Sequence, residues 1–305
     1  SQERQFSRLE ALNFLCQEDR QGILVTNVSG IKLLLPSPKV FASSIFQLKV
    51  GQEIDLTTLS ETLQKIGYQK VSQVLQQGEF SLRGDILDIF EIDQLQPYRI
   101  EFFGDEIDGI RIFDPESQRS VENVEEVQLK AVSDLLLQEE DFIRGQQQIE
   151  QLQEQSANEE FKSYLAEILG DISQRKLHPD LRKFISFFYE KQYTLFDYLP
   201  KHTPVFLDDY QKIADQIARF ELDTANLLTE DLHKNRASSR QVYFADTSTT
   251  LRKYTPATYF SNFQKGLGNL KFDHLYQFNQ YPMQEFFGQF DLLKEEIERY
   301  RKSNY

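Results

Sequence analysis

The chain lacks several features on which whole classes of protein depend. Only one of its 305 residues is a cysteine, Cys16, so an internal disulfide framework and a thiolate zinc cluster are excluded. Basic residues are scarce, with 34 lysines and arginines against 48 acidic residues and a net charge of −14. General binding to a phosphate backbone needs the opposite balance. Apolar runs are too short to span a membrane, and we expect a reducing, cytoplasmic location.

The sequence also lacks the motifs of nucleotide chemistry. No G-x-x-x-x-G-K-[ST] phosphate loop occurs, and GLGNL at 266–270 has only the first two glycines of a dinucleotide fingerprint. The strand end VFLDD resembles a magnesium-binding element, but without a phosphate loop we interpret Asp209 as the cap of the next helix. The four histidines have neither metal-ligand nor triad spacing. We therefore expect no catalytic residue, no metal and no cofactor in this chain.

What is present indicates an α/β protein with an insertion. Apolar runs at 23–28, 204–208 and 241–245 alternate with helical segments, which predicts parallel strands in one sheet. From 68 to 129 the pattern changes to alternating residues with Gly, Asp and Pro punctuation, which predicts an antiparallel meander. A helix that begins near Asp55 or Thr57 and ends at Gly67 precedes this meander. The small α+β unit therefore interrupts the α/β sheet.

Four further helical segments and the domain limits follow from the same reading. We expect helices at 2–18, across the glutamine-rich 134–174, over 178–200 from Pro179, and at 283–302 with one apolar face. The expected domains are an outer α/β domain at 1–49 and 131–265, the inserted domain at 50–130, and a linker with the start of another domain at 266–305. The first residues, Ser-Gln-Glu, and the polar end indicate a segment of a longer protein.

The strand PYRIEFFG, 97–104, carries an unusual pair of faces. Alternation gives one face with Arg99, Glu101 and Phe103, and a second face with Ile100 and Phe102. The second face is the natural core face. The first face then presents an arginine and a phenylalanine outward, with Arg83 in a neighbouring strand.

Two interpretations of this outer face remain open. In the structural one, Arg99 pairs across the strands with an acid such as Asp88, and a loop covers Phe103. In the functional one, Arg83, Arg99 and Phe103 form a docking site, because arginines and aromatics on a rigid sheet are favoured binding anchors.

The stretch GYQKVSQVLQQGEFSLRGDILDIF with PYRIEFFGDEIDGIRIFDPESQRS, about 67–120, resembles the UvrB-like N-terminal region of the transcription-repair coupling factor (Mfd) family. The flanking SRLEALNFL and PVFLDDYQKI are similar to it as well. The resemblance implies that the inserted domain binds UvrA through Arg83 of SLRG, Arg99 of PYRIEFF and Phe103, the second phenylalanine of that motif. The related UvrB sequences have a further arginine where Ser81 stands, so a contact at Ser81 is not expected.

The resemblance also implies an outer domain that is a degenerate RecA/helicase-like relative of the first UvrB domain. The expected function is a non-catalytic recruitment module that links stalled RNA polymerase to nucleotide excision repair. The full-length parent would be an ATP-dependent DNA translocase, which contacts RNA polymerase and DNA through other parts. Two alternatives stay open: an autoinhibitory module for a downstream translocase, and the first part of an active UvrB-like helicase. The tyrosine-rich hairpin of UvrB is missing here, which favours the coupling-factor family.

Overall fold

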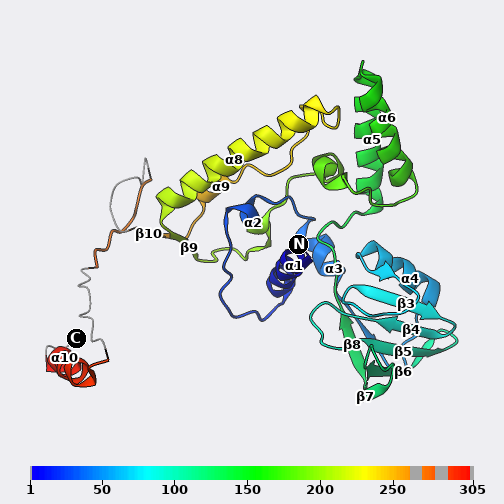
Figure 1. The fold of residues 1–305 in the computed structure, drawn as a ribbon, viewed down its shortest axis with the longest axis horizontal. Coiled ribbons are helices and arrows are strands. Elements are labelled where there is room, and N and C mark those ends of the chain that lie inside the picture. Colours follow the sequence, from blue (N-terminus) through cyan, green and yellow to red (C-terminus); the bar gives the residue numbers. More distant parts are fainter. Residues whose placement is uncertain (1, 262–269, 279–287, 303–305) are drawn as a thin grey trace. The chain divides into compact units, whose positions relative to one another are not determined.

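The computed structural model describes residues 2–261, 270–278 and 288–302. The chain divides into two compact units, Ser1–Gly266 and Leu267–Tyr305. The larger unit is a mixed α/β structure, in which a small sheet domain is inserted between helical segments (Figure 1). The fold class expected from the sequence, α/β with an inserted α+β domain, is therefore confirmed.

The inserted domain is built on a six-stranded sheet in which the strands follow chain order. Its strands are β2 (Gln69–Lys70), β3 (Glu79–Arg83), β4 (Ile86–Ile89), β5 (Tyr98–Phe103), β6 (Glu106–Phe113) and β7 (Ser120–Val124). Neighbours from β3 to β7 are antiparallel, and the short β2 runs parallel to β3. The expected meander is thus confirmed. The hydrogen-bonded strands from β2 to β7 therefore form one continuous sheet.

Helix α4 (Leu56–Lys65) packs against the inner face of the sheet. Leu59 and Leu63 of α4 are fully buried in one hydrophobic cluster with Ile100 of β5. The Asp55 side chain accepts the Thr58 N–H at the start of the helix, and this hydrogen bond satisfies a donor that the first turn leaves free. Gly67 follows the end of the helix with a φ of +104°, a conformation that favours glycine. Both predicted ends of this helix are confirmed.

A second, two-stranded sheet joins the ends of the inserted domain. Strand β1 (Phe46–Lys49) pairs antiparallel with β8 (Glu126–Leu129). The chain therefore enters and leaves the domain on adjacent strands. Leu48 and Leu129 are fully buried at this pair and belong to the same hydrophobic cluster as the sheet and α4.

The glutamine-rich region forms two packed helices rather than one. They are α5 (Glu139–Gln155) and α6 (Glu159–Ser173). The break lies at the short segment before α6, where the Asn158 side chain accepts the Phe161 N–H as an N-cap. Helix α7 (Ile185–Phe188) packs on α5, with the Phe188 ring directly against Gly145. Among the described residues, no helix combines the length and apolar composition that crossing a membrane requires.

The predicted helix over 178–200 is wrong, although its apolar residues lie in the core. The chain forms only short turns here: η1 (Leu181–Phe184), α7 and η2 (Leu195–Tyr198). Leu181, Phe184 and Phe188 are fully buried. Helical spacing of apolar residues therefore marked burial correctly, but three short turns bury the same side chains.

Among the described residues of the outer domain, one pair of strands is parallel. Strand β9 (Val205–Asp208) pairs with β10 (Ala257–Phe260), and α8 (Tyr210–His233) and α9 (Ser248–Lys253) lie between them in the chain. The strand predicted at 204–208 is confirmed, whereas β10 was not predicted. Its β-branched and aromatic residues, Thr258, Tyr259 and Phe260, are the signal that could have indicated it.

The strands predicted at 23–28 and 241–245 are wrong. Ile23 and Val25 have 92% and 87% of their surface exposed, and Asn27 instead caps α2 (Val28–Lys32) through a hydrogen bond to the Gly30 N–H. The segment 241–245 is largely buried, but its backbone bonds to groups outside any strand, as when the Ala245 N–H donates to the Lys32 carbonyl at the end of α2. An apolar run becomes a strand only where a neighbouring strand supplies the ladder.

The remaining helices are α1 (Gln2–Cys16) and α3 (Pro38–Ser43) in the larger unit and α10 (Phe290–Lys302) in the smaller one. The first confirms the helix expected at 2–18. The apolar face expected on the last helix begins at Met283, and residues 283–287 lie outside the described residues. Phe290 and Ile297 of α10 are exposed.

Candidate protein-docking face

The outer face of the inserted sheet carries a row of polar side chains. Residues paired across antiparallel strands point to the same face, so the register places this row directly. The row consists of Ser81 on β3, Asp88 on β4, Arg99 on β5 and Arg111 on β6. Arg83 and Glu101 stand two positions along their strands on the same face. We call the surface formed by Arg83, Asp88, Arg99 and Phe103 the docking face.

Asp88 is the centre of the docking face. Its side chain is only 1% exposed, and both carboxylate oxygens are hydrogen-bonded. Oδ1 accepts from Arg99 Nε at 2.7 Å, and Oδ2 accepts from Arg99 NH2 at 2.9 Å and from Arg83 NH2 at 2.7 Å. A buried carboxylate is stable only with such partners. The two arginines are therefore held through one shared acid.

Arg99 is fixed from several directions. Besides its two-point contact with Asp88, NH2 donates to Gln118 Oε1 at 3.1 Å. The guanidinium lies over the Phe113 ring at 4.5 Å from the centroid, a cation–π contact. Hydrogen bonding to Asp88 raises the pKa of Arg99, against the opposing effect of burial. With 17% of its side chain exposed, Arg99 offers a partner only a small part of its guanidinium.

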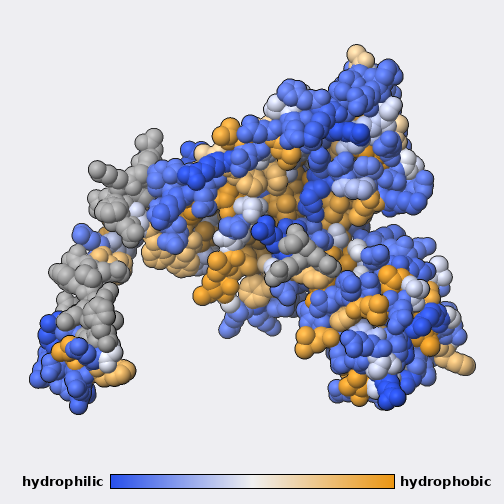
Figure 2. All heavy atoms as spheres, viewed as in Figure 1, coloured by the Kyte–Doolittle hydropathy of each residue, from blue (hydrophilic) through white to orange (hydrophobic). Residues whose placement is uncertain are grey.

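Arg83 and Phe103 are the accessible members of the face. Arg83 has 52% of its side chain exposed, and within the described ranges its guanidinium bonds only to Asp88. Phe103 is 84% exposed at the end of β5, just before the Gly104 turn. Figure 2 shows hydrophobic residues standing out singly from a largely hydrophilic surface around this sheet. An aromatic ring this exposed, on the same sheet face as an accessible arginine, is a favourable anchor for a protein partner.

The structural interpretation of the outer face is right in one part and wrong in another, and the docking interpretation stays a prediction. The structural interpretation correctly predicted the pairing of Arg99 with Asp88, and it was wrong that a loop covers Phe103. The predicted alternation of β5 is confirmed, because Ile100 and Phe102 are buried. The sequence thus located three side chains that do lie on one face, while the burial of Arg99 was not foreseen.

Several residues of this face were missed. Gln118, Phe113 and the ion pair between Arg111 and Glu101 surround Arg99. Gln118 lies in the turn after β6 with a φ of +61°, and its Nε2 donates to the Pro115 carbonyl. No local pattern indicates a glutamine in this role. Ser81 is only 1% exposed and its hydroxyl donates to the Ser72 carbonyl, so it is not available to a partner.

The positions tested for chemistry have structural roles. Asp209 caps α8, where its side chain accepts the Lys212 N–H at 3.3 Å and forms an ion pair with Lys212 at 2.9 Å. These hydrogen bonds lower the pKa of Asp209. His178 accepts the Asp180 N–H in a turn. In the described part of the chain, no three His, Cys, Asp or Glu side chains are grouped so as to hold a metal ion.

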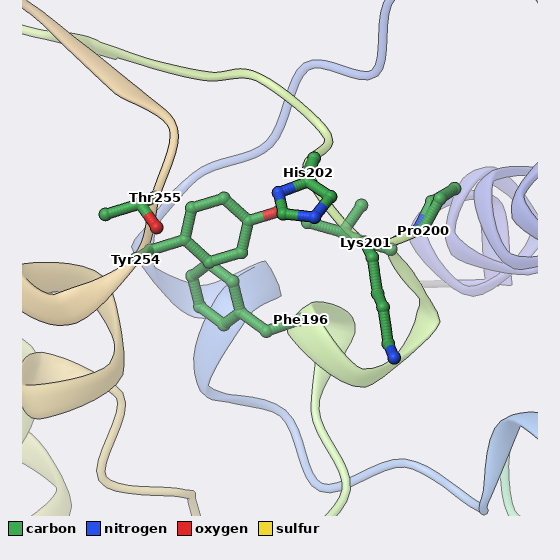
Figure 3. Close-up of a pocket in the computed structure, with 7 residues that line it drawn as sticks. Phe196, Pro200, Lys201, His202, Tyr254 and Thr255 are labelled. Carbon is green, nitrogen blue, oxygen red and sulfur yellow. The ribbon is translucent and has the colours of Figure 1, made fainter.

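An open pocket of about 330 Å³ lies away from the inserted sheet, between the turn after η2 and the segment before β10. Figure 3 shows the rings of Phe196 and Tyr254 side by side, with the Lys201 side chain pointing away from them. The Tyr254 hydroxyl is already engaged with the Thr203 carbonyl at 3.0 Å. Because the Tyr254 hydroxyl is occupied and the Lys201 side chain points away from the two rings, the docking face is the stronger candidate.

Comparison with known proteins agrees with this geometry. Residues 46–134 match the UvrB interaction domain. The chain is 31% identical, over 98% of its length, to the transcription-repair-coupling factor of Staphylococcus aureus strain bovine RF122 / ET3-1. It is 29% identical, over its whole length, to the protein of the same name from Bacillus subtilis strain 168. The chain spans about a quarter of the length of these relatives, 26% and 27%. Residues 46–134 are therefore similar to the UvrB interaction domain, and the chain as a whole is similar to one region of the transcription-repair-coupling factors.

Proposed function

We propose that this chain is a recruitment module that binds UvrA through the docking face and so links a stalled RNA polymerase to nucleotide excision repair. The observation that carries the proposal is Phe103, which is 84% exposed on the same sheet face as Arg83, in a region similar to the UvrB interaction domain. Phe103 enters an apolar pocket of the partner, and Arg83 donates charge-assisted hydrogen bonds to a carboxylate or carbonyl next to that pocket. Arg99 supports both from within the face.

The proposal includes the absence of catalysis in this segment. The sequence has no phosphate loop, and Asp209 is occupied as a helix cap. ATP-driven DNA translocation, and contacts with RNA polymerase and DNA, belong to other parts of a longer protein. We expect the 305-residue chain to have no ATPase activity above background. Hydrolysis that disappears in an Asp208→Asn variant would contradict this part of the proposal.

The test is titration of the purified chain against UvrA by calorimetry. We expect wild-type binding to weaken at least tenfold in Phe103→Ala and in Arg83→Ala, because each removes an anchor at the centre of the contact. The control is Leu95→Ala, which removes a 94% exposed apolar side chain from another loop of the same domain. Leu95→Ala should bind like the wild type. Equal affinities for all four proteins would place the partner on another surface.

A further inference from the structure

Asp88 has a role in the docking face that its burial does not explain by itself. It stands in the middle of β4, opposite Ser81 on one side and Arg99 on the other. A single hydrogen bond to Arg99 would have been enough to stabilise a strand pair. Instead the carboxylate receives three hydrogen bonds from two arginines on the strands to either side. The acid therefore sets the distance and orientation of both guanidinium groups.

The two arginines differ in what they have left to offer. The Nε and NH2 groups of Arg99 are occupied by Asp88 and Gln118. Arg83 gives one N–H to Asp88 and keeps half of its side chain exposed. An arginine has five N–H donors in a planar fork. Asp88 thus holds the Arg83 fork at one corner, while its other donors stay accessible to a partner.

The charge of the cluster narrows the chemistry of that partner. Arg83 and Arg99 contribute +2 and Asp88 −1, which leaves a net charge of +1, and the adjacent Arg111 and Glu101 neutralise each other. A site of net charge +1 beside an exposed phenylalanine suits one carboxylate, or a few carbonyl groups, next to an apolar pocket. It is poorly suited to a run of phosphates, each of which needs its own cation.

We propose that Asp88 is the positioning residue of the docking face: it holds the accessible fork of Arg83, with Arg99 as its support, in a cluster of net charge +1 that fits a single acidic group of the protein partner. This role rests on the proposed binding of UvrA. Fixing a long side chain before association lowers the entropy lost on binding, so the effect of Asp88 is on affinity although it touches no partner atom.

The experiment compares the 305-residue chain with its Asp88→Asn variant in titrations against UvrA. Asparagine keeps the size of the side chain but removes the charge and one acceptor. If Asp88 positions the arginines, the variant binds at least tenfold more weakly, although its face is more positive. If only charge matters, the variant binds equally well or more tightly, and that result overturns the proposal. Failure of the wild type to bind would overturn both the proposed function and this role.

Two further measurements separate positioning from a loss of folding. Gln118→Asn shortens the surface side chain that accepts a hydrogen bond from Arg99, and it leaves Asp88 in place. Asparagine also tolerates the positive φ of this turn. We expect this variant to fold and to bind three- to fivefold more weakly. In nitrogen-15 spectra, the Arg99 Nε–H should exchange slowly in the wild type and rapidly in Asp88→Asn. Slow exchange in both proteins would show that Asp88 does not fix Arg99.

Discussion

Arg83 and Arg99 share the carboxylate of Asp88, but solvent reaches them to different extents, 52% against 17% of the side chain. This difference separates their contributions to binding and to folding. Losing Arg83 leaves Asp88 with both hydrogen bonds from Arg99. Losing Arg99 leaves a buried carboxylate with a single, half-exposed partner.

We predict that Arg99→Ala lowers the free energy of unfolding by about 3 kcal/mol, since breaking a buried ion pair strands its acid. Arg83→Ala should cost less than about 1 kcal/mol, as an exposed pair does. Urea denaturation of both variants checks this difference. Comparable losses of stability would contradict the burial seen here. The practical consequence is that weak UvrA binding by an Arg99 variant is informative only if the variant is shown to be folded.

The buried carboxyl of Glu91 makes the stability of the folded chain depend on pH. It is fully buried at the end of β4, where its carboxyl accepts hydrogen bonds from the N–H groups of Asp93 and Lys130. Burial, followed by the interaction with the Asp93 side chain, raises the pKa of Glu91 to about 8, although the hydrogen bond from the Asp93 backbone N–H acts in the opposite direction. Between its ordinary pKa and this value, the folded protein binds a proton that the unfolded chain does not. The stabilisation that protonated Glu91 provides is therefore fully present below the ordinary pKa, and it is lost as the pH rises towards 8.

We expect the free energy of unfolding to fall by about 3 kcal/mol between pH 5 and pH 8 because of Glu91. Asp93, whose pKa is about 2, stays ionised throughout this window. Urea titrations at several pH values test the slope, with Glu91→Gln as the variant that cannot titrate. The variant should show a flatter profile than the wild type. A wild-type profile that rises from pH 5 to 8 would mean that Glu91 is ionised in the folded protein.

At the scale of elements, Gly145 of α5 lies directly against Phe188 of α7. A Cβ atom on Gly145 would lie 2.3 Å from the ring of Phe188, which is itself fully buried. The contact lets the two helices pack without a gap. Gly170 in α6 is the opposite case, because a Cβ atom there meets no atom within 4 Å.

The two glycines therefore predict opposite effects of the same substitution. Gly145→Ala should destabilise the chain by about 2 kcal/mol, because overpacking forces Phe188 to move. Gly170→Ala should stabilise it by up to about 1 kcal/mol, the usual gain from alanine inside a helix. Thermal unfolding of the two variants beside the wild type gives the signs directly. Stabilisation by both would show that Phe188 has room to shift.

For the larger unit as a whole, Asp134 ties the end of the inserted domain to the helical part. It is completely buried between Arg8 of α1 and Arg182 of η1. Arg8 Nε lies 2.5 Å from Oδ2, in the geometry of an ion pair rather than of an aligned hydrogen bond. The single acid thus joins segments that are far apart in the sequence.

We predict that Asp134→Ala lowers the free energy of unfolding by about 2 kcal/mol. Removal of one partner from a fully buried ion pair lowers the free energy of unfolding by more than this. Here about a third of each arginine side chain is exposed, so the expected loss of stability is smaller. Glu126→Ala is the matched control at the same junction, because its pair with Lys49 is about half exposed and contributes little. Calorimetric unfolding compares the two. If Glu126→Ala lowered the free energy of unfolding as much as Asp134→Ala, the buried acid would have no special role at this junction.

What the sequence determined by itself was local. The cap at Asp55 and the glycine at Gly67 define the ends of α4, and the alternation along β5 assigns its faces, because these features depend on neighbouring residues in the chain. The same alternation located Arg99 and Phe103, and the acid of the ILDI strand was recognised as a partner for Arg99.

Only the tertiary structure decided the rest, because it depends on neighbours that are distant in the chain. The apolar runs at 23–28 and 241–245 predicted strands equally well, yet neither has a strand beside it, and only the second is largely buried. On the docking face, the packing of Phe113 and Gln118 around Arg99 made one arginine a support and left the other accessible. Burial and pairing are properties of the assembled sheet, and no single strand carries them.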